Sequence, residues 1–111
     1  MFVTGRAHVQ QHVFNGFQLL HSLIRMRWIT EILYSINVGN TRYNQILGSI
    51  EGMSHTELNR KLALLLERDV IVKETSGGEI HYQLCDFGEE LIHIFNHLAE
   101  LEQRYLPSQA V

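Results

Sequence analysis

Residues Asn40–Asp69 decide the fold, and their second half reads Ser54-His-Thr-Glu-Leu-Asn-Arg-Lys-Leu-Ala-Leu-Leu-Leu-Glu-Arg-Asp69. Ser54 followed three residues later by Glu57 is a capping box, in which the serine hydroxyl accepts a helix N–H and the glutamate accepts the N–H of Ser54. Leucines then recur at positions 58, 62, 65 and 66, which is helical spacing. The stretch predicts an amphipathic helix over residues 54–69.

The first half of the stretch predicts a shorter helix that ends before a glycine turn. Tyr43, Ile46, Leu47 and Ile50 are spaced i, i+3, i+4, i+7, and Gly52 follows. Two short helices around such a turn are typical of a helix-turn-helix, whose second helix is the recognition helix. The helical spacing taken alone fits a plain two-helix hairpin of a small helical domain equally well.

The residues after Asp69 change from a helical to a strand period. Val70–Glu74 and Glu79–Cys85 flank the turn signal Thr75-Ser-Gly-Gly78, which predicts a β-hairpin. A hairpin directly after a helix-turn-helix is a wing, and this order is more specific than the helix pair. Helical patterns also cover residues 17–26 and 28–36, and another runs from Gly88 until the only proline, Pro107.

The predicted fold is therefore mainly α with a small β-hairpin wing, a winged helix-turn-helix domain. We expect an N-terminal arm or short helix over 1–16, the winged domain over 17–106 with its C-terminal helix at 88–106, and a tail at 107–111. The length of 111 residues fits one domain, and 45% hydrophobic residues suffice for a core. No stretch approaches the roughly 18 apolar residues of a membrane span, and no signal peptide is recognised.

The charge and the cysteine content limit which binding partners and which cell compartment are expected. The net charge of −3 counts mildly against nucleic acid, although the local distribution of charge matters more than its sum. The only cysteine, Cys85, excludes an internal disulfide and fits a reducing cytoplasm. A carboxylate beside it, Asp86, raises rather than lowers a thiol pKa, so Cys85 should be unreactive.

The order of motifs from about Phe17 to Tyr105 resembles the HxlR family of bacterial winged-helix transcriptional regulators. The matching segments are Arg27-Trp28, Arg42-Tyr43-Asn44-Gln45-Ile46, Glu51-Gly52-Met53-Ser54, Leu58-Asn59-Arg60-Lys61-Leu62-Ala63-Leu64-Leu65 and Tyr82-Gln83-Leu84-Cys85-Asp86-Phe87-Gly88. Each match is weak by itself, and their order carries the resemblance. It implies a DNA-binding domain whose partner is double-stranded DNA.

The chain also departs from the family pattern. Glu51 stands where the family has proline, Cys85 where it has threonine, and Asp69 where a glycine closes the recognition helix. The wing lacks a basic tip. The N-terminal cysteine with which several members sense oxidants or quinones is absent, so the resemblance implies the DNA-binding mode better than the sensing chemistry. An effector stays unknown.

The candidate DNA-binding residues lie on the predicted recognition helix, before the first helix of the pair and on the wing. Phosphate contacts supply affinity and base-edge contacts supply specificity, with Arg suited to guanine and Asn to adenine. A solvated helix face is the alternative interpretation, and the stem of Lys61 could instead cover the core. The candidates are Arg42, Ser54, His55, Thr56, Asn59, Arg60, Lys61 and Lys73.

A heptad stripe on the C-terminal helix predicts a homodimer. The stripe is longer than a small core needs, and an apolar face of the first helix is its expected partner surface. The predicted interface residues are Leu91, Ile94, Leu98, Leu101 and Tyr105, with Phe17, Leu20 and Ile24.

No pattern supports catalysis, a cofactor or a metal. His8/His12 and His93/His97 have the i, i+4 spacing that can chelate zinc on a helix, but surface histidines are the better interpretation. We therefore expect a non-enzymatic, homodimeric transcriptional regulator, most simply a repressor. The alternative is a winged-helix adaptor for protein–protein interaction or for plasmid or phage DNA segregation, suggested by the acidic balance and the leucine-rich helix.

Overall fold

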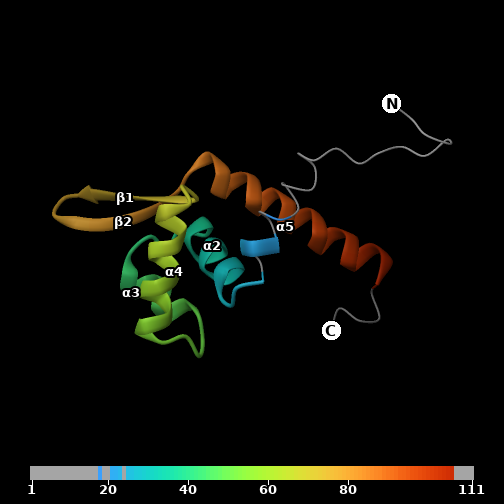
Figure 1. The fold of residues 1–111 in the computed structure, drawn as a ribbon, viewed down its shortest axis with the longest axis horizontal. Helices are drawn as coiled ribbons and strands as arrows, with labels where there is room; N and C mark the ends of the chain where they lie inside the picture. Colours follow the sequence, from blue (N-terminus) through green and yellow to red (C-terminus); the bar gives the residue numbers. More distant parts are fainter. Residues whose placement is uncertain (1–17, 19–20, 24, 107–111) are drawn as a thin grey trace.

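The computed structural model describes residues 18, 21–23 and 25–106 (Figure 1). Residues 21–23 are helical, and the expected arm at 1–16 and tail at 107–111 lie outside the described residues. The elements that follow are α2 (Ile29–Asn37), α3 (Tyr43–Ser49), α4 (His55–Glu67), β1 (Ile71–Ser76), β2 (Glu79–Leu84) and α5 (Asp86–Tyr105). This order of helices and hairpin confirms the winged helix-turn-helix.

Helices α2, α3 and α4 share one apolar core. The fully buried side chains of α2 include Ile29, Ile32 and Leu33, and α3 contributes Ile46. The face of α4 that meets them carries the predicted leucines. Leu58, Leu62 and Leu65 are buried, whereas Leu64 and Leu66 are partly buried against the same core.

Left-handed backbone separates the helices. Trp28 has φ 78° and caps the start of α2, Gly39 has φ 112° just after its end, and Gly52 has φ 86° in the turn before α4. Asp69 also has a positive φ, 57°, after α4. Asp69 therefore takes the conformation for which the family uses glycine, at a cost that a short polar side chain keeps modest.

The wing is a two-stranded antiparallel hairpin with Ile71 opposite Leu84 and Ser76 opposite Glu79. Gly77 and Gly78, with φ 58° and 81°, form the turn. Positive φ at both central residues is the geometry of a two-residue hairpin turn that matches strand twist. The strand β1 thus continues through Thr75 and Ser76, two residues that the sequence assigned to the turn.

The base of the hairpin is joined to the start of α5. The carbonyl oxygen of Val70 accepts a hydrogen bond from the Cys85 N–H at 3.0 Å. The same oxygen lies only 2.4 Å from where a Cβ on Gly88 would stand. A side chain at Gly88 would therefore separate the wing from α5, which explains the glycine at this position.

Helix α5 begins at Asp86, two residues before the expected start. Its N-terminal half packs on the core through Leu91, Ile92 and Phe95. Its C-terminal half extends away from α2–α4 and the hairpin (Figure 1). The tertiary structure thus divides one amphipathic stripe into a part that builds the protomer and a part that the described residues leave exposed.

Candidate nucleic-acid interface

The start of α4 is fixed by the predicted capping box. The Ser54 hydroxyl accepts the Glu57 N–H at 3.2 Å, and Glu57 Oε1 accepts the Ser54 N–H at 3.1 Å. Both bonds satisfy donors that a helix end leaves free. The first turn of α4 is therefore held in a defined orientation.

A tryptophan from another helix extends this cap. Trp28 Nε1 donates a hydrogen bond to Glu57 Oε2 at 3.0 Å. The hydrogen bond from the Ser54 backbone, and then that from Trp28, hold the pKa of the Glu57 carboxyl below its ordinary value. An ionised Glu57 thus ties α4 to the start of α2. Sequence reasoning noted Trp28 only as a motif residue and missed this contact.

The outer face of α4 presents the side chains that the sequence placed on DNA. His55, Thr56, Asn59, Arg60 and Ala63 are exposed, as is the capping Ser54. Arg60 is two positions from the buried Leu58 and Leu62, and each residue advances a helix by about 100°, so it points away from the core. Within the described part of the chain, Arg60 forms no ion pair. Its guanidinium is free for an external acceptor.

His55 is less free than the other residues of this face. Its ring stacks on Tyr43 of α3, with 5.8 Å between centroids and 12° between planes. The Tyr43 hydroxyl lies 3.1 Å from His55 Nδ1. This contact joins α3 to the first residue of α4, and it gives His55 a structural role beside any DNA contact.

Lys61 and Lys73 both lie partly along apolar surface. Lys61 is half-buried on α4, in agreement with the interpretation that its stem covers the core. Lys73 is exposed on β1, and its Nζ stands 5.8 Å from the ring centroid of Tyr82, its cross-strand partner.

Arg42 is engaged by the wing. It caps the start of α3, and its Nη1 lies 3.1 Å from Glu79 Oε1 on β2. Both side chains are half-exposed, so solvent screens the pair. Arg42 was predicted as a DNA-binding residue, and nothing local in the sequence indicated Glu79 as its partner.

Thr41, just before Arg42, anchors the wing to the helical motif. Its carbonyl accepts the Tyr82 N–H at 2.7 Å, and its hydroxyl lies 2.8 Å from His81 Nδ1. The hairpin therefore has a fixed position relative to α3 and α4. Sequence reasoning did not find Thr41 or His81, because the two segments are 40 residues apart.

The comparisons with known proteins agree with this geometry. A family model described as HxlR-like helix-turn-helix matches residues 23–110. The chain belongs to the HxlR family. Its winged helix is accordingly the DNA-binding domain of a transcriptional regulator family. A comparison with curated proteins finds no match.

Solved structures share the fold of this HxlR-family chain at low sequence identity. Reduced YodB, a transcriptional regulator from B. subtilis, has a TM-score of 0.72 and 19% identity, and the match covers 89% of this chain and 96% of that one. A protein assigned to the MarR family from Enterococcus faecalis V583 has a TM-score of 0.79 and 14% identity, covering 96% and 98%. Another protein assigned to that family, from Porphyromonas gingivalis W83, has a TM-score of 0.70 and 20% identity, and the match covers 91% of this chain and 100% of that one.

The predicted dimer residues divide into three groups in the HxlR-family chain. Phe17, Leu20 and Ile24 lie outside the residues that can be described. Leu91 is 3% exposed in the single chain, so its assignment to a dimer surface was wrong: it packs in the protomer core. The remaining side chains on α5 are accessible, namely Ile94, Leu98, Tyr105 and, half-buried, Leu101.

The negative charge of the chain is concentrated away from α4. Helix α5 carries five acidic residues and one arginine, Arg104, so the remainder of the chain has seven acidic and eight basic residues. The recognition helix and wing are therefore close to neutral, and the net charge of −3 is a property of α5. The net charge of the chain therefore no longer counts against DNA binding by α4 and the wing.

The other candidate groups show no further site. Burial first, and then Asp69 and Asp86, raise the pKa of the Cys85 thiol, as an unreactive cysteine requires. His93 and His97 are exposed on α5, His8 and His12 lie outside the described residues, and no metal-binding cluster occurs among the residues described. None of the described helices is long and apolar enough to cross a membrane.

Proposed function

We propose that this chain is a sequence-specific repressor that acts as a homodimer, with α4 in the major groove of its operator. The observation that carries the proposal is the exposed face of α4, on a helix whose start is held by Glu57. Arg60 stands opposite the buried leucines there, and Asn59 is exposed beside it. Side chains on a helix held this firmly keep one register against base edges. Arg60 suits guanine and Asn59 suits adenine.

The wing lies along the flanking sugar–phosphate backbone in this proposal. Thr41 fixes the hairpin beside α3, and Lys73 provides a cation on β1. Arg42 contributes once a phosphate replaces Glu79 as its acceptor. The Ser54 and Thr56 hydroxyls and His55 lie at the N-terminal end of α4, where a phosphate is favoured by the helix dipole.

The C-terminal half of α5 supplies the dimer surface in this proposal. Leu98 is 52% exposed and Tyr105 68%, and a large apolar side chain gains about 1.5–3 kcal/mol when it is buried. A two-fold dimer presents two copies of α4 to two half-sites. Occupation of a promoter by such a dimer blocks transcription without any further surface, which is why repression is the simplest mode.

The alternative of a protein-interaction adaptor is less well supported. It rested on the acidic balance and on the leucines of α4. The acidic excess is located on α5, and Leu64 and Leu66 are partly buried against the core rather than presented to a partner. Neither feature leaves an apolar docking surface on the recognition helix.

A gel shift with the DNA upstream of the protein's own coding region, at two salt concentrations, tests the proposal. We expect a specific complex that weakens as salt rises, because phosphate contacts release counterions. A reporter fused to that DNA should lose expression when the protein is present. Absence of a complex with that DNA and with random genomic fragments would contradict DNA binding, and increased reporter expression would contradict repression.

A further inference from the structure

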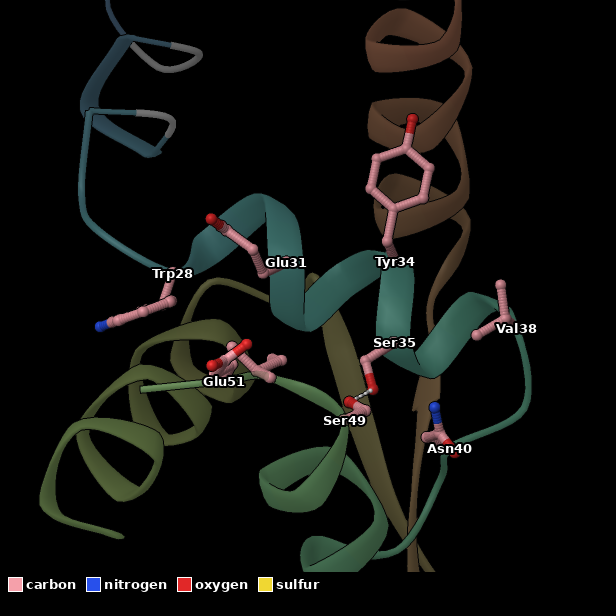
Figure 2. Close-up of a pocket in the computed structure, with 9 residues that line it drawn as sticks. Trp28, Glu31, Tyr34, Ser35, Val38, Asn40, Ser49 and Glu51 are labelled. Atoms are coloured by element: carbon pink, nitrogen blue, oxygen red, sulfur yellow. Dashed lines mark hydrogen bonds between the residues drawn. The ribbon is translucent and has the colours of Figure 1, made fainter. Parts of the chain in front are cut away.

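A groove of about 430 Å³ runs along α2 (Figure 2). One stripe of α2, including Glu31, Ser35 and Val38, forms one wall, and residues 49–51 before the turn to α4 form the other. The volume lies within the range of small-molecule sites, roughly 300–1,000 Å³. The groove is separate from the surfaces assigned to DNA and to dimerisation.

The two ends of the groove differ in chemistry. Figure 2 shows Trp28, Glu31 and Glu51 at one end, and Val38 and Asn40 at the other. Among the described residues that line it, none is a lysine, an arginine or a histidine. Two exposed carboxylates beside an indole make this end anionic and aromatic, which favours a cation and disfavours an anion.

The rest of the groove is suited to an apolar body. Ile50 is buried beneath it and Val38 is 74% exposed along its wall. The hydroxyls between them satisfy each other: Ser35 and Ser49 lie 2.6 Å apart, and Ser49 donates to the Ile46 carbonyl. Both hydroxyl protons therefore already have acceptors within the protein. A ligand can cover these groups without leaving a donor unsatisfied.

The Trp28 indole already contacts one cationic side chain of the protein. The Arg27 guanidinium lies over the Trp28 ring at 4.5 Å from its centroid, and Arg27 does not line the groove. The indole N–H is directed to Glu57. Trp28 thus joins the groove on one side to the capping box of α4 on the other, and the groove's second wall leads directly into the turn at Gly52.

We propose that this groove is an effector site for a small organic cation with an aromatic or aliphatic body, and that its occupation alters the start of α4 through Trp28 and Glu57. The cationic group lies between Glu31 and Glu51, and the apolar body lies over Ile50 towards Val38. The inference deepens the proposed function by giving the chemical class of the effector. Its tests need no DNA, so its failure is distinct from a failure of DNA binding.

The first test uses the only tryptophan of the chain, Trp28, as the probe. Benzyltrimethylammonium should change its fluorescence saturably at constant ionic strength, whereas benzyl alcohol and benzylsulfonate should act far more weakly. Glu31→Gln with Glu51→Gln should weaken binding of the cation by about two- to fivefold for each carboxylate removed. Glu89→Gln with Glu90→Gln, on exposed positions of α5, is the matched control and should bind as the wild type does.

The second test measures hydrogen exchange of the Ser54 and Glu57 amides with and without the same cation. A change in their protection, with the amides of α5 unchanged, supports coupling between groove and recognition helix. Equal binding by the wild type and the double glutamine variant, or an equal response to benzyl alcohol, would overturn the site. Saturable binding that leaves both amides unchanged would overturn the effector role.

Discussion

Trp28 and Glu57 are joined by a hydrogen bond of 3.0 Å between the indole N–H and the carboxylate, although they are 29 positions apart in the sequence. The carboxylate also accepts the Ser54 N–H and hydroxyl. One side chain therefore caps the recognition helix and fastens it to α2. The orientation of α4 relative to α2 depends on this carboxylate.

Acid should weaken the fold through Glu57. Its pKa is lowered in the folded protein, so its contribution to stability is complete above the ordinary value of 4.5 and is lost as the pH falls through the lower folded value. Glu57→Gln should therefore be less stable than the wild type at neutral pH, and the difference should shrink as the solution is acidified. Denaturant unfolding across this pH range measures it.

Glu67→Gln, at the other end of α4, is the matched control for removing a carboxylate from this helix. A Glu57→Gln difference that stays constant with pH would show that the carboxylate's charge contributes nothing to folding.

Ser54→Ala should lower the free energy of unfolding by about 0.5–2 kcal/mol, because the Glu57 N–H loses its acceptor. Thermal or denaturant unfolding gives the value. The order of preference among operator variants should not change, since Ser54 is placed only near phosphate. An unchanged melting temperature would mean that the cap does not stabilise α4.

Arg60→Ala should flatten the preference at one base pair of each half-site. A bidentate contact from Arg to guanine gives about 1–3 kcal/mol of discrimination, and the exposed Arg60 side chain supports no packing that would be lost. Binding to a set of single-base operator variants, with a melting curve as the folding control, tests this. Intact affinity and intact base preference would refute the major-groove arrangement.

Arg42→Ala should weaken binding to all sequences about equally. It should also make the slope of log K against log salt shallower by roughly 0.9 per lost phosphate contact, hence up to about 2 per dimer. Binding isotherms at several salt concentrations provide the slope. A change in base preference would show instead that Arg42 reads the sequence.

Glu79→Gln should have the opposite effect on affinity, because it frees Arg42 from its 3.1 Å ion pair. We expect the affinity for DNA to rise by up to about fivefold, because an exposed ion pair such as this one contributes at most about 1 kcal/mol. Glu74→Gln removes the same charge from the same hairpin without an arginine partner in the described structure, so it separates release of Arg42 from the general loss of negative charge. Equal gains from both variants would contradict a specific role for Glu79.

Leu98→Glu with Leu101→Glu should give monomers in analytical ultracentrifugation, because charge would replace apolar area on the C-terminal half of α5. Gln103→Glu, an exposed position turned away from Leu101 on the same helix, should leave the dimer intact. A double variant that remains dimeric would place the interface on another surface.

Much of this fold depends on interactions between residues that are close together in the sequence, so sequence patterns indicate it. Ser54 and Glu57 are three residues apart, the buried leucines of α4 repeat with the helical period, and Gly77 and Gly78 supply the positive φ of the hairpin turn. Each of these features depends on neighbours within one helical turn or one hairpin. The order of elements, and with it the winged helix, could therefore be predicted.

The candidate site could be predicted only in part from such local patterns. The sequence by itself determined which residues of α4 face outwards, because helical periodicity separates Arg60 from Leu58 and Leu62. Only the tertiary structure decided that Arg42 pairs with Glu79, that Leu91 belongs to the core, and that Trp28 holds Glu57 beside a groove on α2. The reason is that periodicity fixes directions within an element, whereas these contacts depend on how separate elements pack against one another.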